Sequence, residues 1–378
     1  MYLPPIFILL TALKTSTSWA NQPCPELIKN WINTNAPNYN IQGLSLSIIE
    51  AKGKICTLAY VFRSKLTHAK VNEKTLFNAA SISKPLTASV ALKVFSQNNF
   101  DINKPINNYL KSWKLQAPED LDPEKVTLKN LLNHSSGLTG FRCIGYKQNQ
   151  PFPTLLEALD GKPPANTPAV TLVSKPNTQY LYSPAAYMIV EQSLTDILRK
   201  PFSQIMKEEL LNPLLMTHST FEQPLPKKYF KNLAYPYLPN GELIAGGPLN
   251  FAAKAAGGLW TTAADLSRFL LAIQHSLKAM ESTNLTKLYL TPLFSKNWGL
   301  GIQVNLDKNG SETEKGSYFG HGGFNSGYLS YMLASKDEPV GFAVLINTAP
   351  LMTTKGEVVQ FGFIKALNKQ ISTLYDWH

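Results

Sequence analysis

The sequence predicts an α+β fold, in which an antiparallel sheet built from the N- and C-terminal segments is flanked by helices and carries an inserted, mainly helical region. Two observations lead to this prediction. Alternating and β-branched runs occur near both ends of the chain, and apolar residues recur at helical spacing between them. The sheet part covers about residues 21–80 and 290–378, and the helical part covers about residues 81–289. We expect a functional site in the cleft between the two parts.

The strands of the predicted sheet come from both ends of the chain. Residues 42–62 contain two strand-like runs around the polar turn Ala51–Lys54, which is typical of a β-hairpin. Near the C-terminus, three further strands and a closing helix are expected over Tyr318–Gly323, Tyr328–Ala334, Val340–Ile346 and residues 356–374.

The inserted region begins with a helix near Ser81. Apolar residues recur at helical spacing over Leu86–Phe95, and Pro85 falls in the first turn, where proline is tolerated. Further helical patches, such as Tyr187–Ile197, are joined by proline-rich loops that include Pro151–Pro168.

Composition and charge exclude some classes of function. Of the 378 residues, 44% are hydrophobic and 16% are charged, so residues 21–378 are long and apolar enough to form a single two-part domain. Lys and Arg exceed Asp and Glu by 36 to 25. Because the basic residues are scattered among acidic ones, we interpret the surplus as a solvated surface and expect no nucleic-acid partner.

The N-terminus resembles an export signal. Pro4–Leu13 is apolar and is followed by small and polar residues that end at Ala20, although no Lys or Arg precedes the apolar run. We therefore interpret residues 1–20 as a signal peptide. No other segment approaches the ~18 apolar residues of a membrane helix, so a periplasmic or secreted mature chain without a transmembrane segment is expected.

The three cysteines are Cys24, Cys56 and Cys143, and they cannot all pair with one another. Buried or free thiols are the default expectation, and a bridge between Cys24 and Cys56 is an alternative in an oxidising compartment that the sequence leaves open. No C-x-x-C or H-E-x-x-H spacing indicates a metal site, and we expect neither metal nor cofactor.

The sharpest chemical signal is Ser81-Ile82-Ser83-Lys84. Residues three apart at a helix start share a face, so the Ser81 hydroxyl and the Lys84 amine can meet. A desolvated amine can accept the proton of a serine, which would make Ser81 a nucleophile. By itself this short motif is also compatible with an ordinary capped helix start.

Two further motifs contain candidate catalytic residues. Tyr182 precedes Ser183-Pro184 at a helix entry, where it can relay a proton if it lies near a lysine. His321 opens the run Gly320-His321-Gly322-Gly323-Phe324 on a strand, in which glycines indicate a close approach of backbone or ligand. Packing alone is the alternative role for both side chains.

In their order and context, these three motifs resemble the serine β-lactamase and penicillin-binding protein family, in particular its class C and DD-peptidase branch. The resemblance extends over about residues 25–370. It includes three more segments that are similar to family motifs: Leu131–Leu138, Asn212–Met216 and Gly257–Leu266.

The resemblance implies a β-lactamase/transpeptidase-like fold and a role for each motif residue. Ser81 would attack a carbonyl while Lys84 and Tyr182 exchange the proton. The backbone amides of Ser81 and Phe324 would form the oxyanion hole, and His321, Gly322 and Gly323 would line the substrate site. His134, in the Leu131–Leu138 motif, would support the site.

Two departures from the family pattern concern the substrate. Pro184 stands where class C enzymes have an asparagine that contacts the substrate amide, and His321-Gly322-Gly323 stands for Lys-Thr-Gly. Histidine at the first place is seen in DD-peptidase, esterase and aminopeptidase relatives. We therefore expect weak β-lactam turnover compared with ester or peptide turnover. We also expect a pH dependence for carboxylate-bearing substrates, because an unperturbed imidazole titrates near ~6.5.

The sequence thus predicts an exported serine hydrolase that acts through an acyl-enzyme on an amide or ester, such as a D-amino-acid peptide, a small ester or a β-lactam. The partner is expected to be a small-molecule or peptide substrate, which includes cell-wall peptide. The alternative is a non-catalytic penicillin- or cell-wall-peptide-binding protein that retains the fold. The identity of the acyl donor and the oligomeric state stay open at this point.

Overall fold

The structure is a computed structural model that describes residues 22–140, 144–279, 284–354 and 358–378. The predicted signal peptide, residues 1–20, and Cys143 lie outside the described residues. Within the described part, no helix is both long and apolar enough to cross a membrane.

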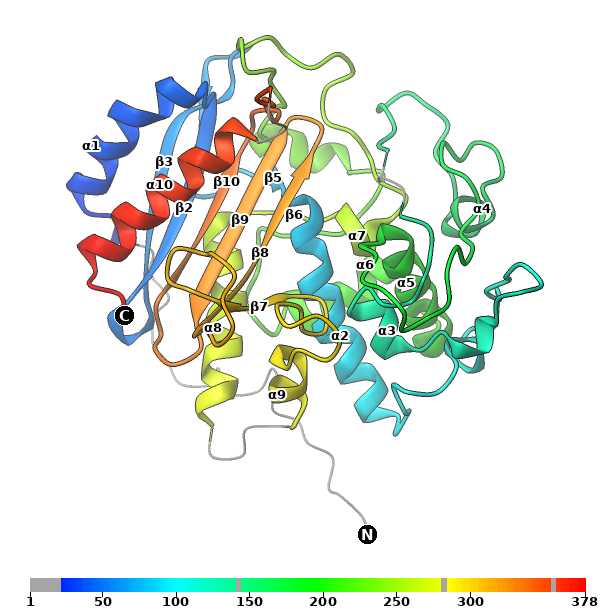
Figure 1. The fold of residues 1–378 in the computed structure, drawn as a ribbon. Helices are drawn as coiled ribbons and strands as arrows, with labels where there is room; N and C mark the ends of the chain where they lie inside the picture. The colour runs from blue at the N-terminus through cyan, green and yellow to red at the C-terminus, as the bar shows by residue number, and fades with distance from the viewer. Residues whose placement is uncertain (1–21, 141–143, 280–283, 355–357) are drawn as a thin grey trace.

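The main sheet contains eight strands in the described residues, and both ends of the chain contribute to it (Figure 1). In spatial order the strands are β1 (Gln22–Pro23), β3 (Lys54–Ser64), β2 (Gly43–Glu50), β10 (Gly341–Ile346), β9 (Tyr328–Ser335), β8 (Tyr318–Asn325) and β7 (Gln303–Leu306), with β4 (Ala69–Lys70) paired to β3. The pairing is antiparallel except between β1 and β3. The predicted hairpin is confirmed, and β2 pairs with β10 from Leu44 opposite Ile346 to Ile49 opposite Gly341.

Helices cover both faces of this sheet (Figure 1). α1 (Glu26–Asn35) and α10 (Val359–Leu374) bury their apolar residues against one face. α8 (Ala263–Lys278) packs against β2, β9 and β10 on the other face. The sequence assigned α8 to the helical part, and its amphipathic pattern did not reveal which apolar surface it covers. The structure corrects this, because α8 is a layer of the sheet part.

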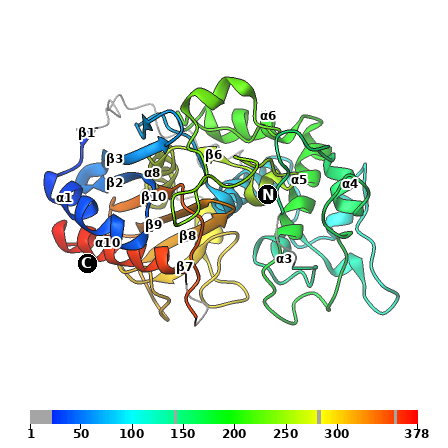
Figure 2. The ribbon, with the colours of Figure 1, turned by 90° about the horizontal axis from the view of Figure 1, so that it is seen from above.

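The helical part lies beside the sheet part (Figure 2) and is centred on two 15-residue helices. They are α2 (Ser83–Gln97) and α5 (Pro184–Leu198), which pack against each other and are buried on most sides. The remaining helices are α3 (Leu128–Leu132), α4 (Leu155–Asp160), α6 (Phe202–Met206), a π-helical turn (Lys207–Leu211), α7 (Lys254–Gly257) and α9 (Asn284–Leu290). Short 3₁₀ turns occur at Ala36–Tyr39, Ala51–Gly53, Ala80–Ile82, Ile106–Asn108, Pro123–Lys125 and Lys227–Asn232, and a small sheet pairs β5 (Phe77–Asn78) with β6 (Trp260–Thr261).

This part is less helical than the sequence predicted. Between α2 and α5, the described residues contain only the short helices α3 and α4 and two 3₁₀ turns. The segment is rich in proline, and each proline removes a backbone donor that a helix requires. α3 and α4 are short helices, and capping boxes at Thr127 and Thr154 stabilise their N-terminal ends.

The predicted helix start near Ser81 is confirmed to within two residues. Ser81 lies in the 3₁₀ turn Ala80–Ile82, and the α-helix begins at Ser83. Ala80 has a φ of 49°, in the left-handed region that is strained for a residue with a Cβ atom. This backbone reversal interrupts the helical pattern directly before Ser81.

Cys24 and Cys56 form a disulfide bond in the structure. The bond joins the entry of α1 to β3, next to the parallel pairing of β1 with β3. The sequence left this pairing open.

Candidate active site

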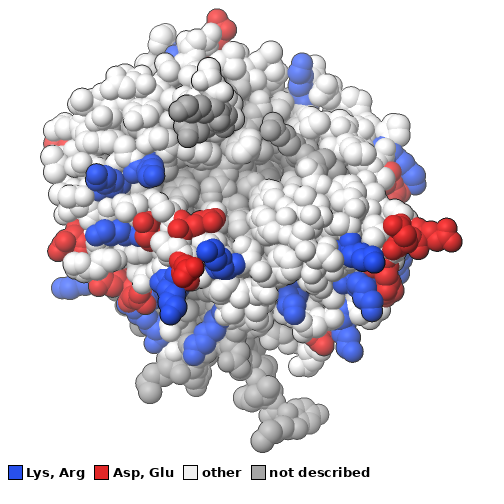
Figure 3. Space-filling view, viewed as in Figure 1, with Lys and Arg blue, Asp and Glu red and all other residues white. Residues whose placement is uncertain are grey.

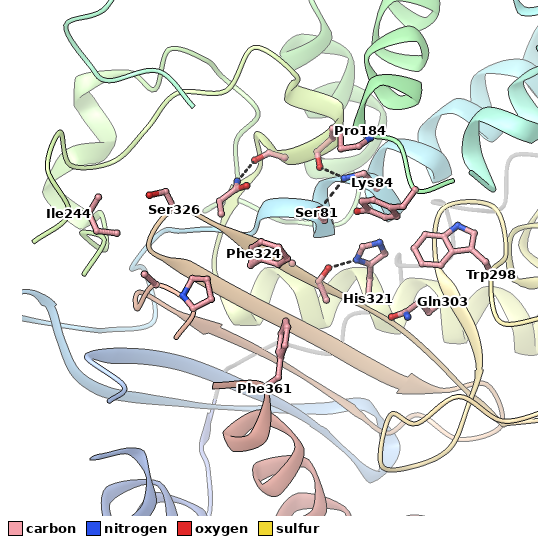
Figure 4. Close-up of a pocket in the computed structure, with 18 of the residues that line it drawn as sticks. Ser81, Lys84, Pro184, Ile244, Trp298, Gln303, His321, Phe324, Ser326 and Phe361 are labelled. Atoms are coloured by element: carbon pink, nitrogen blue, oxygen red, sulfur yellow. Dashed lines mark hydrogen bonds between the residues drawn. The ribbon is translucent and has the colours of Figure 1, made fainter. Parts of the chain in front are cut away.

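A cavity of about 760 Å³ lies between the sheet part and the helical part, where the functional site was expected (Figure 4). The motifs at residues 81–84, 182–184 and 321–324 are far apart in the sequence but meet there. The predicted site residues that line the cavity are Ser81, Lys84, Tyr182, His321, Gly322, Gly323 and Phe324.

Ser81 and Lys84 are in direct contact. Lys84 Nζ donates a hydrogen bond to Ser81 Oγ at 3.1 Å and another to the backbone oxygen of Ala256 at 2.8 Å. The Lys84 side chain is only 1% exposed. Burial removes water as a competing partner, so the amine is directed at the hydroxyl. The predicted meeting of serine and lysine across one turn is therefore observed.

The carbonyl group that binds Lys84 belongs to α7, and a buried carboxylate of α5 holds this short helix. Glu191 is fully buried, accepts a hydrogen bond from the Ala255 amide at 2.9 Å and forms an ion pair with Lys254 at 2.8 Å. A chain of contacts thus runs from Glu191 through α7 to Lys84. No sequence motif indicated this ion pair.

The Tyr182 ring lies between Lys84 and His134. Lys84 Nζ is 4.9 Å from the centroid of the Tyr182 ring, and the His134 ring centroid is 4.4 Å from it. Within the described residues, no hydrogen bond joins the Tyr182 hydroxyl to Ser81 or Lys84, so its relay role stays a prediction. Ser183 caps α5 by accepting from the Ala186 amide, and Pro184 is the first helical residue, where proline is favoured.

His134 supports this segment, in line with the role that the resemblance implied. Its Nδ1 accepts a hydrogen bond from the Ser183 amide at 3.2 Å, and its backbone oxygen accepts one from the Leu181 amide at 2.8 Å. Burial, with the charge of Lys84 nearby, holds the pKa of His134 well below its usual value. The ring is therefore neutral and positions the residues that flank Tyr182.

His321 lies on β8 and is almost fully buried. Its Nδ1 donates to the backbone oxygen of Gly322, which leaves Nε2 of the neutral ring with a lone pair. Burial, together with the charge of Lys84, lowers the pKa of His321 to about 3. The expected titration near neutral pH is therefore wrong, because the sequence could not show that this imidazole is removed from water beside a lysine.

Gly323 brings β8 close to the turn that contains Ser81. A Cβ atom at this position would lie 2.6 Å from the Ala79 oxygen and 2.9 Å from the Ser81 amide nitrogen. Only glycine permits this approach without a shift of the backbone. Phe324 follows in the strand, and its side chain is 46% exposed at the cavity. The amides of Ser81 and Phe324 stay the predicted oxyanion donors.

Two asparagines that the sequence analysis missed join the two sides of the cavity. Asn78 Oδ1 accepts hydrogen bonds from the Ala80 amide at 3.1 Å and from Asn325 Nδ2 at 2.6 Å. Asn325 also donates to the Gly257 oxygen at 3.2 Å. These bonds connect the strained turn at Ala80 to the end of β8. A single sequence gives no signal for such a contact, because the two residues are 247 positions apart.

Trp298 is a second residue without a sequence signal. Its ring centroid lies 5.1 Å from that of His134, 5.7 Å from that of Tyr180 and 5.3 Å from that of His321. Figure 4 shows the indole at the end of the cavity beside His321. The indole is itself buried and packs against both imidazoles.

Comparisons with known proteins identify the family of the chain. The family model described as "Beta-lactamase" matches residues 26–358. A β-lactamase from Providencia stuartii is 26% identical over 376 residues, which cover 90% of this chain and 91% of that protein. The D-alanyl-D-alanine-carboxypeptidase/endopeptidase AmpH from Escherichia coli (strain K12) is 23% identical over 367 residues, covering 92% and 91%.

Among solved structures, a class C β-lactamase superposes with a TM-score of 0.67 at 18% sequence identity, covering 91% of this chain and 94% of that chain. The similarity confirms the predicted α+β, β-lactamase-like fold. The family match covers most of the chain and confirms the resemblance inferred from the motifs: the chain belongs to the β-lactamase family.

Proposed function

We propose that this protein is an exported serine hydrolase that cleaves an amide or ester through an acyl-enzyme on Ser81. The observation that carries the proposal is the buried Lys84, which holds the Ser81 hydroxyl at 3.1 Å inside a cavity large enough for a small substrate. The names of the relatives support a β-lactam or a D-alanyl peptide as candidate acyl donors, since one relative is a β-lactamase and another is a D-alanyl-D-alanine-carboxypeptidase/endopeptidase.

In the proposed reaction, Ser81 Oγ attacks the carbonyl carbon and its proton passes to Lys84 and Tyr182. The backbone amides of Ser81 and Phe324 stabilise the negative oxygen; loss of one such donor typically costs ~3 to 4 kcal/mol. The same proton is delivered to the leaving group as its bond to the carbonyl breaks. Water then attacks the acyl-enzyme, its hydroxyl joins the acyl group, and its proton returns to Ser81. His321 and the two glycines that follow it form the wall against which the substrate lies.

The decisive experiment is labelling with a fluorophosphonate probe and with a fluorescent penicillin. We expect both to label the mature chain and to lose all labelling in the Ser81→Ala variant. Ser96→Ala, at an exposed serine near the end of α2, is the matched control and should label normally. Labelling that persists in Ser81→Ala would show that Ser81 is not the nucleophile. Stable acylation without any turnover would favour the alternative of a penicillin-binding protein.

We infer export from the predicted signal peptide, and the Cys24–Cys56 disulfide supports it, because such bonds persist in oxidising compartments. Expression of the full chain in a Gram-negative host, followed by N-terminal sequencing of the periplasmic fraction, tests this inference. We expect a mature chain that begins at Asn21. Full-length protein confined to the cytoplasm would contradict export.

A further inference from the structure

The cavity continues beyond Ser81 into a pocket of apolar side chains, which we call the apolar arm. Its residues come from the loop after Leu233, from β8, from the end of β10 and from α10 (Figure 4). They are Leu238, Ile244, Phe324, Ala349, Pro350 and Phe361.

The loop that forms one side of the apolar arm is held by its own hydrogen bonds. The Leu238 amide donates to the Glu242 oxygen at 2.7 Å, and the Ile244 amide donates to the Pro236 oxygen at 3.0 Å. Ile244 also packs on the turn between β8 and β9, since a Cβ atom at Gly327 would lie 2.9 Å from Ile244 Cδ1. The apolar arm is therefore a built surface beside the nucleophile.

The cavity contains little charge to attract an ion. Among the described residues that line it, Lys84 alone has a formal charge, and its amine is already bound to Ser81 and Ala256. His321 is neutral above pH ~3, because burial lowers its pKa to about 3. Figure 3 shows a hollow between the two parts in which no described Lys, Arg, Asp or Glu is seen, while such residues gather lower on this face and at its edges.

We propose that the cavity selects acyl donors with an apolar, uncharged acyl chain, which lies in the apolar arm while the carbonyl group is held at Ser81. This inference rests on the proposed function and specifies its substrate class. Each methylene that leaves water for an apolar surface gains up to about fourfold in binding, the equivalent of ~0.8 kcal/mol. A carboxylate in the same place would lose its hydration without gaining a free cationic partner among the described lining residues.

The first test measures kcat/KM for the p-nitrophenyl esters of acetate, butyrate and hexanoate. We expect kcat/KM to rise about two- to fourfold per methylene along this series. The second test compares the hexanoate ester with the mono-p-nitrophenyl ester of adipate, which has a carboxylate at the far end of a chain of the same length. We expect the adipate ester to be at least 30-fold poorer.

Variants of the apolar arm locate the effect. Ile244→Gln keeps the length of the side chain but makes it polar, and it should lower the hexanoate-to-acetate ratio of kcat/KM at least fivefold. Leu238→Gln, on the same loop, is a second variant with the same expected direction. Leu27→Gln is the matched control, because Leu27 is 54% exposed on α1, on the far face of the sheet, and the ratio should not change.

The outcomes separate this inference from the proposed function. If an ethyl fluorophosphonate fails to label Ser81, the proposed function itself fails. If the probe labels Ser81 but kcat/KM is flat along the ester series, or the adipate ester is turned over as well as the hexanoate ester, the apolar selection is overturned and the hydrolase stands. If the hexanoate-to-acetate ratio of kcat/KM is unchanged in both Ile244→Gln and Leu238→Gln, the apolar arm is not the place where the acyl chain binds.

Discussion

The cavity has two walls with different physical character. The helical wall contains Ser81, Lys84 and Tyr182, and its charges are buried and paired: Lys84 is bound by the Ala256 carbonyl, and Glu191 binds Lys254 behind α7. The sheet wall, residues 321–325, presents a neutral imidazole, two glycines and an exposed phenylalanine. In the proposed mechanism, the helical wall supplies the nucleophile and the proton transfer and the Phe324 amide completes the oxyanion hole, whereas the rest of the sheet wall and the apolar arm beyond it determine which substrate fits.

The largest effect should come from removal of the Lys84 amine on the helical wall. Lys84→Met keeps the length of the side chain but removes the proton acceptor, so we expect kcat/KM for p-nitrophenyl butyrate to fall about 10⁴-fold. Because the lysine is buried, its replacement by an apolar residue should cost less than ~1 kcal/mol of stability. Lys104→Met, at an exposed lysine, is the control for both measurements. If Lys84→Met kept more than a tenth of the wild-type kcat/KM, the helical wall would not be the source of the proton acceptor.

The second effect concerns Tyr182, whose ring touches Lys84 but whose hydroxyl has no observed bond to it. Tyr182→Phe keeps the ring contacts with Lys84 and His134. If the hydroxyl relays the proton, turnover should fall roughly 10²- to 10⁴-fold with little change in melting temperature. Near-normal turnover would assign Tyr182 to packing and leave proton transfer to Lys84 alone.

The third effect tests how the helical wall is positioned. Glu191→Gln removes the charge opposite Lys254 but keeps an acceptor for the Ala255 amide. Breaking such a buried pair typically costs ~3 to 5 kcal/mol of stability. We also expect a roughly tenfold loss of kcat/KM, because α7 holds the carbonyl that binds Lys84.

A double-mutant cycle distinguishes positioning from simple destabilisation. Glu191→Gln combined with Lys254→Met removes both charges and should restore part of the lost stability. If Glu191 acts through α7, the acylation rate by the fluorophosphonate should recover together with stability. Recovery of stability without recovery of acylation would show that the ion pair stabilises the fold and does not position Lys84.

The sequence predicted the sheet wall and the helical wall unequally. Local signals, such as the spacing of Ser81 and Lys84 or the glycines before Phe324, sufficed to identify candidate residues that line one cavity, and strand periodicity sufficed for the sheet. The contacts of Asn78 with Asn325 and of Glu191 with Lys254 depend on tertiary packing between distant segments, for which a single sequence contains no pattern. The pKa of His321 was mispredicted for the same reason, since its burial is a property of the assembled cavity.

The smallest effect is a pH dependence of stability that originates on the sheet wall. His321 faces Trp298, and its burial together with the charge of Lys84 of α2 lowers its folded-state pKa to about 3 against an ordinary value near 6.5. Between these two values the unfolded chain binds a proton that the folded chain does not, so stability falls as pH falls below ~6.5. His134, whose pKa is also lowered, acts in the same direction.

We expect His321→Gln to reduce the slope of unfolding free energy against pH by up to about 1.4 kcal/mol per unit between pH 4 and 6, measured by urea unfolding. His378→Gln, at the exposed C-terminus, is the control. A slope that is the same in wild type and in His321→Gln would mean that His321 has the same pKa in the folded and the unfolded chain, and the sheet wall would then present a cation to the substrate below pH ~6.5.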